Sequence, residues 1–401
     1  MTAWAEARQL AYELGGALPR ESESLPLALL TGRTLTSDVR SPTALPGYAS
    51  SAMDGWVVAG DAPWLLGPAI LAGDSPSDAL LLAGNARPIA TGGPIPPGAA
   101  GVLRSEHGDT SPHSGETEAV TQLWLRPGNS ARADEPRSGE HIRPIGEEAA
   151  QGDLLLTAGV VLTPPRLALA AVAGIDALRV ERVPPIDVTL LGDEVITAGL
   201  PRAGEVRDAY SPQFPGLFRS VGAEINVLQR VSDDLDSTIQ AFGIGSAALH
   251  VSTGGTGRGP ADHVRAALSA IGATLELDGV AMRPGHPVIL ARRPDGRLIL
   301  CLPGNPLAAM VAFLSFGQPL IEGMLGRSLS RLSSRLLDAD VPNASRQTRL
   351  VTFTDTETGI VVTPHQGSGM LRGLSDADGI LIIPAGGCLA GNAVDTLPLP
   401  W

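Results

Sequence analysis

The chain has 401 residues and carries 42 acidic against 29 basic side chains, a formal net charge of −13. All of the basic side chains are arginine, and the absence of lysine excludes a Walker-type phosphate loop, a lysine Schiff base and a Ser-x-x-Lys hydrolase site. The negative charge repels polyphosphate backbones and acidic lipid surfaces, so we expect neither nucleic acid nor a membrane as a partner.

Cysteine usage and the first residues indicate the compartment. The two cysteines, Cys301 and Cys388, are too few for a disulfide framework and lack the Cys-x-x-Cys spacing of zinc or redox sites. Glu6 and Arg8 interrupt the region where a signal peptide would need a continuous apolar core. We therefore expect a cytoplasmic protein.

The first half of the chain predicts two interleaved modules. In chain order, we expect a helix at 4–14, a strand-like alternation at 26–40, a β-rich region at 42–137 and a helix at 166–174. Gly15 and Gly16 end the helical pattern of the first element. The polar segment 126–140 returns the chain to its starting module, so residues 1–40 and 140–180 are expected to pack together.

From Pro184 onward, continuous apolar strands alternate with helices, a pattern typical of a parallel sheet covered on both faces. The expected strands are 186–191, 225–228, 247–252 and 298–302, and the expected helices are 215–221, 234–242, 260–271 and 306–321. Residues 287–290 form a hairpin with the strand at 298–302. Short strands at 350–353, 359–362 and 379–383 predict a small C-terminal β-domain.

One stretch of this region is long enough to span a bilayer. Residues 298–321 contain no charged side chain over 24 positions. The turn sequence Pro303-Gly-Asn-Pro306 lies inside the stretch, however. A strand, a tight loop and a helix capped by Asn305 explain the same residues without a membrane.

The unusual residues of the second half follow the predicted strands. In open doubly wound sheets, ligands bind beyond the carboxyl ends of the strands. Three such strands run into Gly192-Asp-Glu194, into the loop 253–262 and into Pro303-Gly-Asn-Pro306. Together with Asp208, which precedes a further helix, these loops predict a single cleft.

The loop 254–259 contains Gly254, Gly255, Gly257 and Gly259 and leads into a helix. Its backbone N–H groups and the helix dipole suit a phosphate. The spacing does not match the dinucleotide G-x-G-x-x-G pattern, so a nicotinamide site is disfavoured. The alternative is a turn that merely needs positive φ.

Acidic side chains lie beside the phosphate loop. Asp193, Glu194, Asp208 and Asp262 can hold Mg²⁺, which takes carboxylate and water oxygens and is commonly shared with a substrate phosphate. We expect Asp262 above all, because it follows the phosphate loop directly. Helix capping is the alternative, and at least one of the four is expected to have that role.

Cationic and hydroxyl donors form a third group. Arg283 and His286 lie on one proline-rich loop, and Ser368 lies in a segment of hydroxyl, imidazole and guanidinium side chains with Arg349 nearby in sequence. Such donors suit a small oxyanion. A proline turn and a polar β-domain surface with solvated side chains are the alternatives.

These residues belong to motifs that resemble one known family, the molybdopterin molybdenumtransferases, which include the C-terminal domain of gephyrin. The resemblance covers essentially the whole chain. The motifs, in the family's order, are Ser51-Ala-Met-Asp-Gly55, Thr91-Gly-Gly-Pro-Ile-Pro96, Ser138-Gly-Glu-His-Ile-Arg143, Gly146-Glu-Glu148, Gly192-Asp-Glu194, the loop 252–262, Arg283-Pro-Gly-His-Pro287 and Leu302-Pro-Gly-Asn-Pro306.

The resemblance implies a multidomain α/β plus β fold and a homodimer. The expected parts are a composite linker domain (1–41 and 138–181), an extended β-domain (42–137), a doubly wound α/β pterin-binding domain (182–328) and a C-terminal β-barrel (329–401). In the family the site lies at the subunit interface. Asp54 and Thr91 of one subunit would therefore approach the α/β domain of the other.

The implied reaction inserts molybdenum from molybdate into adenylylated molybdopterin, with Mg²⁺ as cofactor and AMP as leaving product. A molybdopterin adenylyltransferase is a further expected partner. The implied catalytic residues are Asp54, Glu194, Asp208 and Asp262, of which the last three also hold the metal. The implied substrate-binding residues are Thr91, Glu148, Gly254, Gly255, Gly257, Arg283, His286, Pro303, Gly304, Asn305, Arg349 and Ser368.

Several positions depart from the family's usual residues. Lysine is usual at Arg283 and His286, aspartate at Glu148, threonine at Leu191 and asparagine at Tyr210. Arg283 keeps the charge, whereas His286 keeps it only when protonated. The Thr-Gly-Gly-Thr-Gly string of the glycine loop resembles that of the related adenylyltransferases. The departures leave a second hypothesis, a diverged non-catalytic molybdopterin-binding carrier or assembly scaffold.

Overall fold

The computed structural model describes residues 1–112, 122–259, 262–357 and 359–401, which form two compact units. The large unit contains residues 1–37, 158–163 and 177–401, and the small unit contains 38–157 and 164–176. The expected helix start at 260–261 and part of the expected β-rich region, 113–121, lie outside the described residues. The four domain boundaries drawn from the sequence stay predictions.

A six-stranded sheet forms the centre of the large unit. Its order is β16 (Glu224–Val231), β13 (Pro185–Leu191), β17 (Leu249–Thr253), β21 (Leu298–Leu302), β20 (Ile289–Arg292) and β18 (Thr274–Asp278). The first four strands are parallel, and β20 and β18 are antiparallel to their neighbours. The parallel sheet and the hairpin are as expected, whereas β18 was missed although its residues Thr274–Asp278 alternate between polar and apolar.

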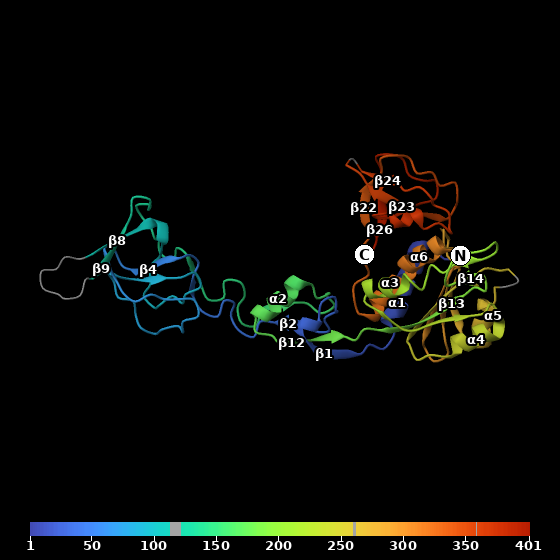
Figure 1. Cartoon of the computed structure of the whole chain (residues 1–401), viewed down its shortest axis with the longest axis horizontal. Helices are drawn as coiled ribbons and strands as arrows, with labels where there is room; N and C mark the ends of the chain where they lie inside the picture. Colours follow the sequence, from blue (N-terminus) through green and yellow to red (C-terminus); the bar gives the residue numbers. More distant parts are fainter. Residues whose placement is uncertain (113–121, 260–261, 358) are drawn as a thin grey trace. The chain divides into compact units, whose positions relative to one another are not determined.

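Helices cover both faces of this sheet. On one face, α3 (Phe214–Ser220), α6 (Pro306–Ala312) and α7 (Gln318–Met324) share a buried cluster with Leu298, Leu300 and Leu302. On the other face, α4 (Leu235–Gly243) and α5 (Val264–Ala270), which lie side by side in Figure 1, pack on Ile299 and Cys301. Successive residues of β21 thus point to opposite faces, as the pleat of a strand requires.

The apolar helix that follows β21 is a core element. Residues Pro306–Met324 are long and apolar enough to cross a membrane, but 94% of their most apolar window is buried inside the protein. A short π-helical segment, Phe313–Gly317, joins α6 to α7. The N-terminal helix α1 (Trp4–Gly16) packs against α7, and Trp4 Nε1 donates to Ser315 Oγ at 3.0 Å.

A second sheet contains the C-terminal strands. Its order is β19 (Met282–Arg283), β23 (Thr348–Asp355), β25 (Gly379–Ile383), β26 (Ala393–Pro398) and β22 (Ser333–Leu336), with β24 (Ile360–Val362) paired to β23. Because β19 belongs to a loop of the α/β domain, its pairing with β23 joins the two domains. Leu350, Ile380 and Leu397 also share the buried cluster of the α/β domain.

The remaining elements of the large unit are short. They are β1 (Ser22–Pro26) paired with β12 (Ala177–Glu181), β14 (Val195–Ile196) paired with β15 (Val206–Arg207), the 3-10 turn Leu27–Leu29 and the one-turn helix α8 (Arg372–Ser375). The expected strand at 26–40 is wrong as a single element, because the 3-10 turn and irregular backbone separate β1 from β2 (Val39–Arg40).

The small unit is built on a six-stranded sheet. The order is β7 (Gly101–Arg104), β4 (Gly55–Ala59), β6 (Asn85–Ile89), β5 (Trp64–Leu66), β9 (Leu123–Pro127) and β8 (Gly108–Pro112). Two short pairs, β3 (Ser50–Ser51) with β10 (Ile142–Arg143) and β2 with β11 (Leu154–Leu156), the 3-10 turn Ser105–His107 and helix α2 (Pro164–Val172) complete it.

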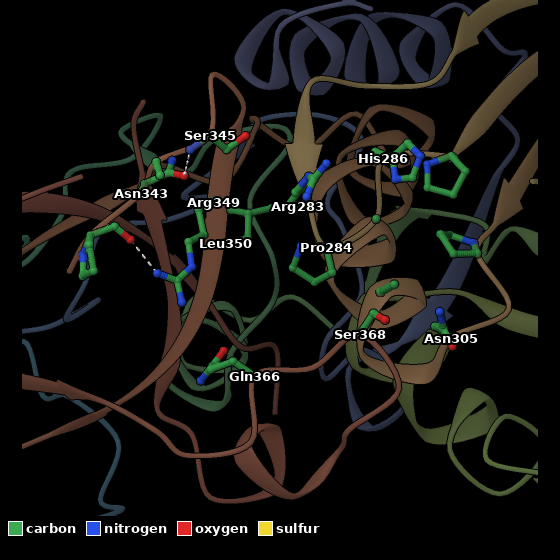
Figure 2. Close-up of a pocket in the computed structure, with 16 residues that line it drawn as sticks. Arg283, Pro284, His286, Asn305, Asn343, Ser345, Arg349, Leu350, Gln366 and Ser368 are labelled. Carbon is green, nitrogen blue, oxygen red and sulfur yellow. Dashed lines mark hydrogen bonds between the residues drawn. The ribbon is translucent and has the colours of Figure 1, made fainter. Parts of the chain in front are cut away.

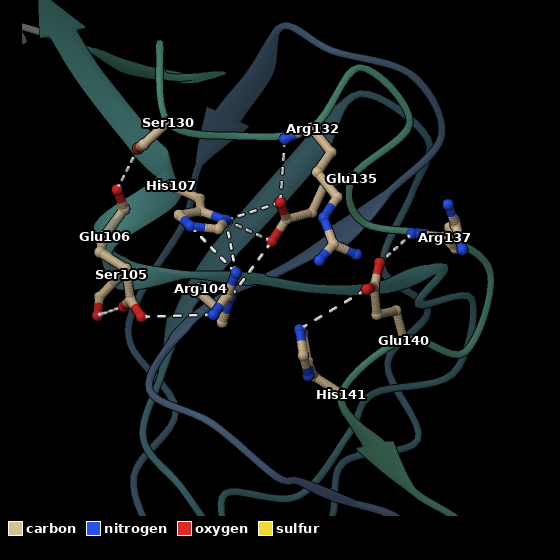
Figure 3. A network of polar contacts seen from close by, with 10 residues as sticks. All are labelled: Arg104, Ser105, Glu106, His107, Ser130, Arg132, Glu135, Arg137, Glu140 and His141. Atoms are coloured by element: carbon tan, nitrogen blue, oxygen red, sulfur yellow. Dashed lines mark hydrogen bonds and ion pairs between the residues drawn. The ribbon is translucent and has the colours of Figure 1, made fainter.

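A polar network fixes the segment after β9 to this sheet (Figure 3). The buried Glu135 carboxylate accepts from His107 Nδ1 at 2.7 Å, from the Arg132 N–H at 3.2 Å and from Arg104 Nε at 3.4 Å. Burial alone would raise the pKa of Glu135, but the bonds from Arg132 and His107 outweigh it and lower the pKa. The network therefore favours the charged carboxylate.

Candidate active site

Loops from four parallel strands meet at one edge of the α/β sheet. They follow β13, β16, β17 and β21, and three of them were expected from the sequence. Between them lies a pocket of about 820 Å³, here called the acidic pocket. Its lining includes Leu191, Glu194, Tyr210, Asp233, Gly254, Gly255, Thr256, Gly257, Asp262, Pro303, Gly304 and Asn305.

Gly254 and Gly255 of the loop after β17 are required by its geometry. Gly254 and Gly255 have φ values of 90° and 62°, the left-handed region in which a side chain is strained. A Cβ at Gly254 would lie 2.9 Å from the Leu191 carbonyl oxygen, and one at Gly257 would lie 2.5 Å from Asp262 Oδ2. Glycine is therefore needed in this loop both for the positive φ of a turn and for the close approach of neighbouring atoms.

Asp262 occupies donors that a phosphate would use. Its Oδ1 accepts from the Gly257 N–H at 3.0 Å, and its Oδ2 accepts from the Gly259 N–H at 2.6 Å. The loop thus already holds an anion, which is its own carboxylate. A phosphate that used the same two amides would have to displace Asp262.

Asp208 is also engaged. Its Oδ1 accepts from the N–H groups of Tyr210 and Ser211 at 2.9 and 3.1 Å, and its Oδ2 pairs with Arg230 at 2.6 Å. Burial alone would raise the pKa of Asp208, but the bonds from Ser211 and Tyr210 and the charge of Arg230 hold it below its usual value. Asp208 therefore stabilises the turn ahead of α3 and does not cap the helix itself, whose N-cap is Gln213.

The three expected metal ligands are not gathered into one cluster. Among the described residues, no group of three or more His, Cys, Asp or Glu side chains is placed to hold a metal ion. Glu194 is exposed and lines the acidic pocket, whereas Asp208 and Asp262 are bonded as described above.

Asp233 is a lining residue that the sequence analysis missed. It follows β16, and its carboxylate accepts from the Asp193 N–H at 3.2 Å. Burial raises its pKa, and the negative charges of Glu194 and Asp193 add to the rise. The signal in the sequence that could have identified Asp233 is its position just after a parallel strand. The adjacent Asp234 is the N-cap of α4, accepting from the Ser237 N–H at 2.8 Å.

A second pocket of about 630 Å³, here called the arginine pocket, lies between the α/β domain and the C-terminal sheet (Figure 2). It brings together the expected oxyanion donors Arg283, His286, Arg349 and Ser368. The two pockets share Pro287, Pro303 and Asn305 in their linings. The loop 303–305, here called the shared loop, therefore borders both.

Arg283 and Arg349 are direct neighbours across the β19–β23 pair. Arg283 Nε donates to Gln347 Oε1 at 2.8 Å, and an Nη of Arg349 donates to the Pro342 carbonyl at 2.6 Å. Among the residues that the structure describes, neither guanidinium has a carboxylate within 4.0 Å. Both arginines line the arginine pocket, and charged donors of this kind suit an oxyanion.

Three expected site residues lie in the small unit. Asp54 Oδ1 accepts from the N–H and the hydroxyl of Thr91 at 2.7 and 3.0 Å, so the structure brings these two residues together. The Thr91 amide holds the pKa of Asp54 below its usual value. Glu148 is exposed, and its backbone N–H donates to the Leu45 carbonyl. The approach of Asp54 and Thr91 to the α/β domain of another subunit stays a prediction.

Models of three protein regions match consecutive parts of the chain. Residues 2–174 match the MoeA N-terminal region (domain I and II), residues 187–323 match a probable molybdopterin binding domain, and residues 337–399 match the MoeA C-terminal region (domain IV).

Curated relatives match nearly the full length. A protein of Mycobacterium tuberculosis named molybdopterin molybdenumtransferase 2 is 30% identical over 386 residues, 90% of each chain. A Synechococcus elongatus protein named molybdopterin molybdenumtransferase is 29% identical over 385 residues, 92% of each chain. The crystal structure of the molybdopterin biosynthesis moeA protein from Pyrococcus horikoshii OT3 covers 99% of this chain with a TM-score of 0.78 at 21% identity, a likeness of fold.

Proposed function

The chain belongs to the molybdopterin molybdenumtransferase family, and on that premise we propose that its cleft cleaves adenylylated molybdopterin, releases AMP and inserts molybdenum from molybdate. The protein is a transferase of molybdenum cofactor biosynthesis. The observation that carries the proposed reaction is the shared loop, which borders an acidic pocket on one side and an arginine pocket on the other. A phosphoanhydride bound through Mg²⁺ and an oxyanion need these two environments next to one another.

The arginine pocket is proposed to bind molybdate. Arg283 and Arg349 supply two guanidinium groups without a carboxylate partner among the described residues, and Ser368 supplies a hydroxyl donor. Charge-assisted hydrogen bonds of this kind are about twice as strong as neutral ones. Molybdate bound there would compensate the positive charge of the two arginines.

The acidic pocket is proposed to bind the phosphates, the pterin and Mg²⁺. The side chains fit the cation, because the Glu194 and Asp233 carboxylates both line the pocket and a cation would compensate their negative charge. Mg²⁺ is commonly held by one or two carboxylates, waters and substrate phosphates. Glu194 and Asp233 are therefore the better ligands in this arrangement, whereas both Asp262 oxygens already accept a hydrogen bond from the Gly257 and Gly259 amides. When bound, Mg²⁺ neutralises charge on the phosphates.

The family's homodimer is proposed to complete the site, with Asp54 and Thr91 of one subunit serving the cleft of the other. An adenylyltransferase that produces the adenylylated pterin is the proposed partner, and the cytoplasm is the proposed compartment.

The C-terminal sheet is proposed to close as a barrel. The isolated bridge between Leu337, next to β22, and Ile360 of β24 supports this closure.

The reaction is tested by incubating the purified protein with adenylylated molybdopterin, Mg²⁺ and molybdate and measuring AMP by chromatography. We expect molybdate-dependent AMP release that Arg349→Gln reduces and Arg346→Gln leaves unchanged. Arg346 is an exposed arginine near Arg349 in sequence that does not line either pocket. No AMP above background would refute the proposal. Pterin binding without turnover would favour the carrier or scaffold instead.

A further inference from the structure

Tyr210 lies against the shared loop. Its side chain is 7% exposed, and its hydroxyl donates to the Gly304 carbonyl at 2.8 Å, with the Pro303 carbonyl at 3.4 Å. The ring contacts Phe214 with centroids 5.2 Å apart, and Phe214 in turn contacts Phe218 at 5.6 Å. The aromatic contacts hold the ring in place, so the hydroxyl bonds the loop from a fixed position.

The backbone of Tyr210 is fixed as well. Its N–H donates to Asp208 Oδ1 at 2.9 Å, and Asp208 Oδ2 pairs with Arg230 of β16 at 2.6 Å. A continuous chain of contacts therefore runs from the edge strand of the sheet through Asp208 and Tyr210 to the shared loop. Asp208, expected to be a catalytic carboxylate, belongs to this chain.

The bond to Gly304 also sets the direction of the next amide. In a trans peptide the C=O and the following N–H point in opposite directions. Because the Gly304 carbonyl points to Tyr210, the N–H of Asn305 points away from it. Asn305 lines both the acidic and the arginine pocket.

The bond from Tyr210 fixes the direction of the Gly304 carbonyl within this loop. A Cβ at Gly304 would lie 3.4 Å from the Cα of Gly254, so the shared loop abuts the glycine loop. Burial and then the charge of Asp208 raise the pKa of Tyr210, so its hydroxyl stays a donor at ordinary pH. Removal of the hydroxyl would leave the Gly304 carbonyl without this partner, and the peptide would be free to rotate.

We propose that Tyr210 is a positioning residue. Its hydroxyl fixes the Gly304–Asn305 peptide, so that the backbone N–H of Asn305 binds an anionic oxygen of the nucleotide where the two pockets meet. This role rests on the proposed function, because it assumes a nucleotide in the acidic pocket. It goes beyond that function in assigning the binding geometry to a buried side chain that the reaction itself does not require.

The test compares Tyr210→Phe with Tyr12→Phe. Tyr12 is a matched control, because its hydroxyl also donates to a backbone carbonyl, that of Arg327 at 3.0 Å, outside both pockets. The affinity of the full-length protein for AMP is measured by calorimetry with Mg²⁺ present, and stability is measured by thermal unfolding. We expect Tyr210→Phe to lose about tenfold in AMP affinity, and Tyr12→Phe to lose stability but keep its affinity.

A crystal structure of Tyr210→Phe separates failure of this inference from failure of the proposed function. If the wild-type protein binds AMP and Tyr210→Phe binds it equally well, the positioning role is wrong. If the wild-type protein does not bind AMP, the proposed nucleotide is wrong, and the variant structure decides about Tyr210. A rotated Gly304–Asn305 peptide would support the positioning role, and an unchanged peptide would overturn it.

Discussion

Replacing Gly15 by alanine tests how closely α1 approaches α7. A Cβ at Gly15 would overlap the backbone carbonyl of Leu320, which cannot rotate away as a side chain would. A Cβ at the neighbouring Gly16 would have its nearest contact 4.0 Å away, at the Gly323 carbonyl. Both glycines belong to the last turn of the same helix, so Gly16→Ala is a matched control.

The expected cost follows from three contributions. Overpacking costs up to about 3 kcal/mol, and the better helix propensity of alanine returns about 1 kcal/mol. Displacement of α1 would also strain the bonds from Trp4 to Ser315 and from Arg8 to the Ser330 carbonyl, each worth about 1 kcal/mol. Gly15→Ala should therefore lose about 2–4 kcal/mol, whereas Gly16→Ala should be neutral or gain up to about 1 kcal/mol.

Hydrogen exchange followed by mass spectrometry suits this test, because the chain has two units and a single unfolding midpoint would mix them. Peptides from α1 and from residues 306–324 should exchange faster in Gly15→Ala, and peptides from β4 and β6 of the small unit provide an internal reference. Equal exchange in Gly15→Ala and Gly16→Ala would refute the close approach of the two helices.

Three further predictions concern charge. Glu194→Gln should raise the Mg²⁺ concentration needed for half-maximal AMP release several-fold, whereas Glu224→Gln, on β16 outside the acidic pocket, should not; equal Mg²⁺ curves would contradict the ligand role. Because the pKa of Glu135 is lowered by folding, its stabilising effect is present above the unfolded pKa of about 4.3 and is lost as the pH falls through the folded value. Hydrogen exchange of β7, corrected for the intrinsic rate, should show this acid sensitivity reduced in Glu135→Gln, and an unchanged pH profile would speak against it. His286→Lys should increase the rate of AMP release, because it restores the permanent cation that is usual at this position in the family; an unchanged rate would contradict a need for that cation.

The sequence predicted where the cleft lies better than what its carboxylates do. The rule that ligands bind beyond the carboxyl ends of parallel strands located three of the four loops. It did not reveal that Asp208 pairs with Arg230 or that Asp262 bonds the amides of its own loop, because these partners depend on how each loop bends. A carboxylate near a cleft is visible in the sequence, whereas a carboxylate free to bind a cation is not.

The roles of adjacent residues of the same type were the hardest to distinguish from the sequence. Asp233 and Asp234 both follow β16, but the first lines the acidic pocket and the second caps α4. Gly15 and Gly16 were read together as a helix end, and α1 does end at Gly16. The additional role of Gly15 depends on Leu320, which lies more than 300 positions away in the sequence.

The bond between Asp262 and the Gly257 and Gly259 amides has a consequence for selectivity. A carboxylate tethered within a few residues of its donors competes at an effective concentration on the order of millimolar or higher. Free phosphate and other simple anions can use only those amides, so they must displace the Asp262 carboxylate without binding energy from elsewhere in the cleft. A ligand anchored elsewhere in the cleft, by a base or a pterin ring, brings further binding energy to the exchange. Under the proposed function, the loop would therefore discriminate by the size of the whole molecule rather than by the charge of the group it holds.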